Sequence, residues 1–166
     1  MRPLLIGIVI VAVLAVAVFI GYRAATNNAG PEHVAVFYTK LDGDTVVPWN
    51  VSLGSARDPA SVAFYAATQA AAGPAPDVRA IRFPAGTIVR HVDVTDATAV
   101  VDLGGAVTKR TDGGSFAETG EFKALVWTLT ALPHITSVRV TIDGATVAAL
   151  PGGQYELDEP LSRSSF

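Results

Sequence analysis

The sequence predicts an α+β fold in which a mixed β-sheet carries two helices on one face, in the order β-α-β-β-α-β, preceded by one transmembrane helix. Three observations support this prediction. Two stretches, at 58–74 and 115–133, carry helix start and stop signals. The runs around them are short and rich in β-branched residues, as strands are. Near its start, the chain also has 20 consecutive uncharged residues between Arg2 and Arg23.

The uncharged segment is long enough to span a membrane. As a helix, its apolar run covers most of the ~30 Å hydrocarbon layer of a bilayer. A cleaved signal peptide is the competing interpretation, but it needs a shorter apolar core and small residues before the cut. We therefore predict an uncleaved transmembrane anchor at 1–23. Residues 24–32 are small and polar and contain Gly30-Pro31, so we expect a linker there.

The remaining residues, 33–166, suit a single domain. A short tail precedes the predicted span and the whole domain follows it. We therefore expect a single-pass protein of the cell membrane, with the tail in the cytoplasm and the carboxy-terminal domain outside it.

The composition excludes several classes of protein. Of the 166 residues, 50% are apolar and 16% are charged, which excludes a disordered chain. The chain has no cysteine, which excludes a disulfide-rich domain, a cysteine nucleophile and a lipid-modified lipoprotein. Of the 12 basic side chains, Arg2 and Arg23 belong to the predicted anchor. The other 10 face 15 acidic side chains, and this net charge of -5 argues against nucleic acid as a partner.

The first elements of the domain are two strands and a helix. His33–Thr39 is rich in β-branched and aromatic residues and predicts a strand buried on both faces. Residues 46–51 predict a weaker edge strand, since Pro48 removes a backbone donor. Asp58-Pro59 then supplies a helix cap and a first-turn proline, and the helix ends before Gly73-Pro74.

A hairpin and a second helix follow. Residues 87–94 and 98–103 are two β-rich runs separated by Thr95-Asp96-Ala97. Ser115 and Glu118 have the spacing of a capping box and predict the start of the second helix, which Pro133 ends. The apolar stripe of this helix consists of Phe122, Leu125, Val126, Leu129 and Leu132.

The last predicted element is a second hairpin. Val138, Val140 and Ile142 alternate with polar residues and predict a half-buried strand. Asp143-Gly144 is a favourable two-residue turn into residues 145–148. Because the second helix has one apolar stripe and this strand one polar face, we expect both helices on the same side of the sheet.

Residues that could carry chemistry are present but do not form a recognisable site. His33, His91 and His134 fall on different predicted elements, and the pair His91 and Asp93 lacks a third metal ligand. Ser115 follows two glycines but lacks the G-x-S-x-G pattern of a nucleophile elbow. The glycine pairs at 104/105, 113/114 and 152/153 lack the phosphate-loop patterns. We therefore predict no catalytic residue, no metal and no cofactor.

Two pairs of carboxylates and a basic cluster are the remaining candidates. Asp93 with Asp102, or Glu118 with Glu121, could act as an acid–base pair, but nothing in the sequence indicates a cleft or substrate-binding aromatic residues. We therefore predict a protein that is not an enzyme. Phe122 and Trp127 are interpreted as core residues. A basic patch for anionic polymer or lipid headgroups would consist of Arg79, Arg82, Arg90, Lys109 and Arg110, with a solvated surface as the simpler interpretation.

Short motifs in a consistent order suggest a family. They are Gly73-Pro74, residues 81–87, Val92-Asp93-Val94, residues 99–103, Gly113-Gly114-Ser115, residues 125–130, Leu132-Pro133, Val138-Arg139, Asp143-Gly144 and residues 160–163. Together they resemble the GerMN domain, named for a spore germination and sporulation protein, over roughly residues 34–166. Where that family usually has Asp-Gly in the first hairpin, this chain has Asp96-Ala97.

The resemblance implies a fold like the ring-building motifs of bacterial secretion assemblies, and no known catalysis. The expected function is therefore a non-catalytic, membrane-anchored, extracytoplasmic binding or assembly module of the bacterial cell envelope. Its expected partners are envelope proteins or a second copy of the chain, and the membrane through residues 1–23. The alternative is a peptidoglycan-associated protein, or an accessory to a hydrolase, that binds anionic wall polymer or a small envelope ligand.

Overall fold

The computed structural model describes residues 32–56, 58–109, 113–151 and 153–166. The predicted anchor at 1–23 and all but the last residue of the predicted linker at 24–32 lie outside these ranges. Among the helices that the structure describes, none has both the length and the apolar character needed to cross a membrane.

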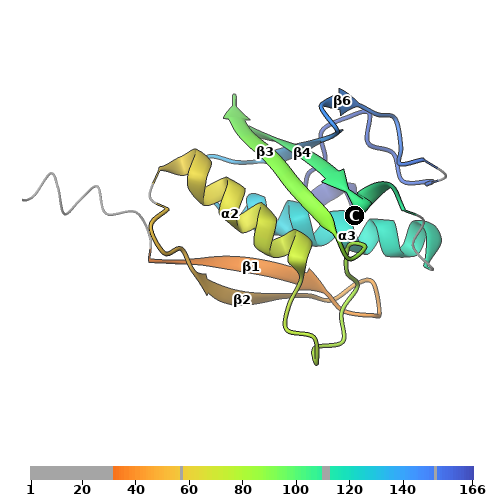
Figure 1. The fold of residues 1–166 in the computed structure, drawn as a ribbon, viewed down its shortest axis with the longest axis horizontal. Helices are drawn as coiled ribbons and strands as arrows, with labels where there is room; N and C mark the ends of the chain where they lie inside the picture. Colours follow the sequence, from red (N-terminus) through yellow and green to blue (C-terminus); the bar gives the residue numbers. More distant parts are fainter. Residues whose placement is uncertain (1–31, 57, 110–112, 152) are drawn as a thin grey trace, which may run out of the picture. The chain divides into compact units, whose positions relative to one another are not determined.

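The described residues form two α-helices and six strands, with short 3-10 turns at Ala106–Thr108 and Arg163–Ser165 (Figure 1). The elements in chain order are β1 (His33–Thr39), β2 (Val46–Ser52), α2 (Pro59–Ala72), β3 (Thr87–Thr95), β4 (Thr98–Gly105), α3 (Gly114–Leu129), β5 (Ser137–Ile142) and β6 (Ala145–Thr146).

The strands form two sheets, whereas a single mixed sheet is predicted from the sequence. Strands β1 and β2 form an antiparallel pair, and the second sheet has the order β3-β4-β5-β6, in which only β4 and β5 are parallel. Both helices pack on one face of the mixed four-stranded sheet, as predicted, but the β1–β2 pair lies on their other side (Figure 1). The fold class α+β is therefore confirmed, and the single sheet is wrong.

The separate β1–β2 sheet has a local cause in helix α3. The backbone N–H of Phe37 in β1 donates to Thr128 Oγ1 at 2.9 Å, and Thr39 Oγ1 donates to the carbonyl oxygen of Gly120 at 2.8 Å. The Thr128 side chain thus satisfies a backbone N–H of β1 that a neighbouring strand would otherwise pair, and the Thr39 hydroxyl adds a second contact with the same helix. Strand β1 is mostly buried on one face and half-buried on the other, and not buried on both faces as the sequence predicts.

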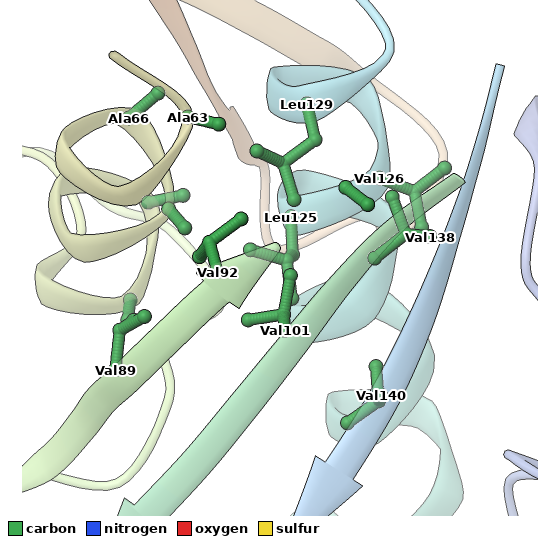
Figure 2. Close-up of a cluster of buried hydrophobic side chains, with 14 of the residues drawn as sticks. Ala63, Ala66, Val89, Val92, Val101, Leu125, Val126, Leu129, Val138 and Val140 are labelled. Atoms are coloured by element: carbon green, nitrogen blue, oxygen red, sulfur yellow. The ribbon is translucent and has the colours of Figure 1, made fainter. Parts of the chain in front are cut away.

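The main core lies between the helices and the four-stranded sheet (Figure 2). Small side chains of α2, such as Ala63 and Ala66, let that helix approach β3 closely. The α3 side chains Leu125, Val126 and Leu129 fill the space above β4 and β5. The predicted stripe of the second helix is therefore its core face, although the helix ends at Leu129, so that Leu132 lies beyond it.

The start of α2 follows the sequence prediction, and the start of α3 does not. Asp58 caps α2 by accepting from the backbone N–H of Ser61 at 2.9 Å, and Gly73 ends the helix with φ of 76°. The capping box predicted at Ser115 and Glu118 is wrong. Helix α3 begins at Gly114, and its N-cap residue is Gly113, which has no side chain to act as a cap. The Glu118 carboxylate accepts instead from the backbone N–H groups of Gln154 and Tyr155.

Candidate binding groove beside strand β3

A groove of about 690 Å³ lies where the start of helix α2 faces strand β3. It is open to solvent and has both apolar and hydroxyl groups on its walls. Phe64, on the second turn of α2, is 40% exposed and offers an aromatic ring to the groove. The lining residues are Ser52 at the end of β2, residues 53–56 after it, Ala60, Ser61, Phe64 and Tyr65 of α2, and His91 and Val92 of β3.

Strand β3 is the outermost strand of its sheet. It pairs with β4 on one side, and no strand within the described ranges pairs with its other side. His91 and Val92 belong both to this edge strand and to the groove wall. The pairing of β3 with β4 shifts register between Val89 and His91, which marks a β-bulge at the start of the groove wall.

This arrangement suits the binding of an extended peptide. Backbone groups along a sheet edge can pair with an added strand, while an adjoining groove receives alternate side chains of that strand. Among these residues, only His91 is a candidate for chemistry from the sequence, as half of a metal site. The feature of the sequence that could have indicated the groove is Phe64-Tyr65, an aromatic pair within an alanine-rich helix.

The histidines and the predicted carboxylate pairs are dispersed over the fold. His33 and His134 do not line the groove, and the described chain contains no group of three or more histidine, aspartate or glutamate side chains that could hold a metal. Asp93 and Asp102 lie on adjacent strands but not opposite each other, since β3 pairs His91 with Asp102 and Asp93 with Val100.

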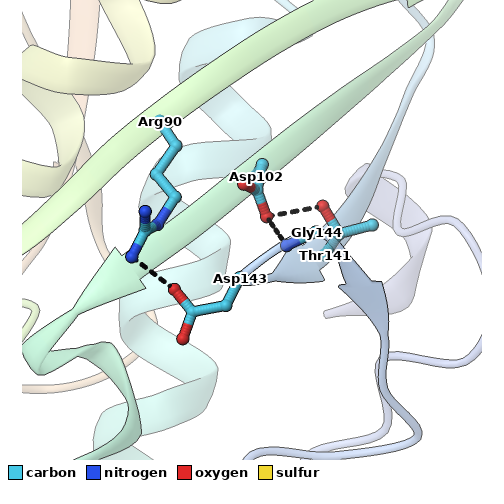
Figure 3. Close-up of polar contacts among 5 residues, drawn as sticks. All are labelled: Arg90, Asp102, Thr141, Asp143 and Gly144. Carbon is cyan, nitrogen blue, oxygen red and sulfur yellow. Dashed lines mark hydrogen bonds and ion pairs between the residues drawn. The ribbon is translucent and has the colours of Figure 1, made fainter.

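Asp102 has a structural role on the exposed side of the sheet (Figure 3). Its Oδ1 accepts from Thr141 Oγ1 at 3.0 Å and from the backbone N–H of Gly144 at 2.7 Å, so it fixes the β5–β6 turn to β4. Arg90 Nη2 lies 2.7 Å from Asp143 Oδ1 in the same turn. These contacts tie β3 and β4 to the tip of the second hairpin.

Glu118 and Glu121 come together, but inside the protein. Glu118 is 8% exposed and Glu121 is 1% exposed, and neither lines the groove beside β3. Burial, with a smaller contribution from the Glu118 charge, raises the pKa of Glu121 to about 8.

The predicted basic patch is partly used for internal contacts. Arg82 donates to the carbonyl oxygens of Pro74, Ala75 and Val78, and so holds together the loop that follows α2. Arg90 pairs with Asp143. Arg79 and Lys109 are exposed, and Arg110 lies outside the described residues.

The two aromatic residues interpreted as core differ in their environment. Phe122 is fully buried, as predicted, between the rings of Phe83 and Tyr155. Trp127 is only half-buried and meets the ring of Phe166 edge-on, at 5.6 Å between centroids. Tyr155 stacks on both Phe122 and Phe166 and so connects the two aromatic groups. Burial raises the pKa of Tyr155 to about 12.

Comparison with known proteins identifies the family. The family described as Germane, sporulation and spore germination, matches residues 35–148. A search of curated protein sequences finds no match.

Solved structures agree with this fold. The first GerMN domain of the sporulation protein GerM from Bacillus subtilis is 26% identical, with a TM-score of 0.61, covering 79% of this chain and 98% of that one. The tandem GerMN domains of the same protein are 23% identical, with a TM-score of 0.64, covering 81% of this chain and 47% of that one. A Clostridium perfringens protein described as a putative lipoprotein is 18% identical, with a TM-score of 0.56, covering 81% of this chain and 89% of that one.

The chain therefore spans about half the length of the tandem structure and corresponds to a single domain of that type. The family match covers more than half of the chain, and the resemblance seen in its motifs is confirmed. The chain belongs to the Germane family of sporulation and spore germination domains.

Proposed function

We propose that this protein is a non-catalytic, membrane-anchored assembly module on the outer side of the cell membrane, and that it docks an envelope protein or a second copy of itself. The observation that carries the proposal is the outer edge of β3, which no strand of the described residues pairs, beside the groove that Phe64 lines. An extended segment of the partner pairs with the edge, and its apolar side chains enter the groove.

The other parts of the proposal have separate support. The uncharged segment between Arg2 and Arg23 supports a membrane anchor. The family description supports a role in sporulation or germination. The internal contacts of Asp102, Glu118, Arg82 and Arg90 leave fewer free groups for catalysis or for binding wall polymer.

Site-specific crosslinking in intact cells tests the docking site. A photoreactive amino acid is placed at Phe64 in the groove and, as a matched control, at Leu41, which is 48% exposed and outside the groove. We expect products from position 64, identified by mass spectrometry as an envelope protein or a second copy. Equal products from both positions, or none from position 64, would contradict the proposed site.

Membrane fractionation tests the anchor independently. We expect the full chain to remain with membranes after washing with salt and to require detergent for release. A protease added outside the cells should digest the domain. A mature protein that begins after residue 23 and is released without detergent would refute the anchor.

A further inference from the structure

Lys123 forms no ion pair with an acidic side chain in the described part of the protein. Its side chain is 8% exposed, and its Nζ donates to the carbonyl oxygen of Gly43 at 2.9 Å. The ion pairs within the described ranges are Arg90–Asp143 and Arg139–Glu159, and neither involves Lys123. An ammonium group has three donors, so two remain available.

Aromatic rings supply part of the missing stabilisation. The Lys123 Nζ lies 6.0 Å from the ring centroids of Trp127 and of Phe166. Such contacts favour a cation but do not replace the hydrogen bonds that it loses on leaving water. A ligand that accepts from the two remaining donors would therefore gain more binding free energy here than from the ammonium group of an exposed lysine.

A pocket of about 380 Å³ lies beside this ammonium group. It shares no lining residue with the groove beside β3. Phe116, which is 53% exposed, provides an apolar wall, and Ser115 and Thr119 provide hydroxyl groups. The full lining is Gly43, Asp44, Ser115, Phe116, Thr119, Lys123 and Phe166.

We propose that this Lys123 pocket binds a carboxylate group that is attached to an apolar or aromatic body. The carboxylate accepts from Lys123 Nζ, and the apolar body lies against Phe116. Asp44 belongs to the same lining and disfavours a second negative charge, so the site selects a monoanion over a phosphate dianion. Two sources offer this chemistry, a small organic acid and the free carboxyl terminus of a peptide.

Fluorescence of Trp127 provides the test, because this ring lies next to Lys123. The full chain in detergent, with Trp49→Phe as the background, is titrated with N-acetyl-phenylalanine and with its uncharged amide. We expect the acid to bind at least about tenfold more tightly than the amide, as charge-assisted hydrogen bonds predict. Inorganic phosphate should cause no saturable change.

Two variants assign the effect to the pocket. Lys123→Met keeps the length of the side chain but removes the charge, and it should abolish the preference for the acid. Lys109→Met removes the same charge from an exposed residue outside the pocket and should leave the preference unchanged. Circular dichroism confirms that each variant is folded; if Lys123→Met is not, the comparison of acid with amide decides alone.

A peptide that ends in phenylalanine separates the two sources. Tighter binding than N-acetyl-phenylalanine assigns the site to a peptide terminus, and equal binding assigns it to a small acid; both support a carboxylate site. Equal affinity for acid and amide, or a preference that survives in folded Lys123→Met, would overturn the proposal.

Discussion

Glu121 places a carboxyl group in the interior of the protein, where its charged form is unfavourable. The side chain is 1% exposed, and its Oε1 is a buried oxygen with no hydrogen-bond partner within the described ranges. Its pKa rises from the ordinary value of 4.5 to about 8, first because of burial and second because of the charge on Glu118. At neutral pH the folded protein therefore holds a proton here that the unfolded chain has released.

This difference predicts how stability depends on pH. Below 4.5 both states are protonated, and between 4.5 and about 8 only the folded state is, so stability falls as pH rises through this window. Glu121→Gln removes the titration. We expect urea denaturation at pH 5, 6.5 and 8 to show a smaller decline for this variant, which should be more stable by about a few kcal/mol at pH 8.

The exposed residue Glu156 provides the control, because Glu156→Gln removes an equal charge at the surface. Its unfolding free energy should decline with pH in parallel with the unmodified chain. If Glu121→Gln also follows that decline, Glu121 is not the group responsible.

The sequence pairs Glu118 with Glu121 but does not reveal that both are buried. An i, i+3 pair of glutamates is typical of an exposed helix face. Here Glu118 accepts from the backbone of Gln154 and Tyr155, so a segment more than 30 residues away in the chain covers the pair. Lys123 was missed for the same reason, since its surroundings come from Gly43 and Phe166.

At the scale of elements, helix boundaries set by local residues were predictable, and those set by distant contacts were not. Asp58 accepts from Ser61 within the same turn, which the sequence alone specifies. Ser115 occupies a similar position by sequence, but its helix has no side-chain cap.

Replacing each predicted cap with alanine separates these cases. Asp58→Ala should lower the melting temperature by a few degrees, because the Ser61 N–H loses its acceptor. Ser115→Ala should change it by much less. Thermal denaturation followed by circular dichroism measures both, and equal losses would mean that Ser115 caps α3 after all.

Gly120 lies where α3 packs against Ile81, in the segment that precedes β3. A Cβ atom at this position would clash with the side chain of Ile81, including a contact of 3.0 Å to its Cγ2. A sequence-based interpretation sees only a glycine that weakens a helix by about 1 kcal/mol. In the structure, the glycine allows a close approach that positions the loop before β3.

Two substitutions together test this interpretation of Gly120. Gly120→Ala should destabilise the protein by about 1–3 kcal/mol through overpacking, despite the better helix propensity of alanine. In an Ile81→Ala background the same change should be neutral or stabilising by up to about 1 kcal/mol. Urea denaturation of the four proteins gives the coupling, and additive effects would show that the contact with Ile81 is not the cause.

At the scale of the whole domain, the order of elements was predictable and their distribution between two sheets was not. Alternation of apolar residues identifies a strand but not its partner, because pairing is set by long-range contacts. The backbone N–H of Phe37 at the edge of β1 donates to Thr128 of α3, a residue that the sequence does not place next to it. The groove beside β3 is formed by residues from β2, α2 and β3, which only the folded chain brings together. The sequence could therefore indicate single residues of the groove but not the groove itself.

The placement of the helices between two sheets predicts that the domain unfolds in one step. Buried residues of both sheets, such as Val36 of β1 and Val101 of β4, belong to one hydrophobic cluster with α2 and α3. If either sheet separated from the helices, buried apolar side chains of α2 and α3 would become exposed to water. This shared core favours a two-state unfolding transition.

The two tryptophans of the chain allow a direct measurement, since Trp49 lies on β2 and Trp127 on α3. Trp127→Phe leaves a fluorescence probe in the small sheet, and Trp49→Phe leaves one at the helix. After allowance for the stability change that each substitution causes, fluorescence and circular dichroism should give coincident urea transitions within each variant. A fluorescence transition of Trp49 at lower urea than the loss of helix signal would show that the β1–β2 sheet unfolds separately. The contacts of Phe37 and Thr39 with α3 would then be too weak to couple the two sheets.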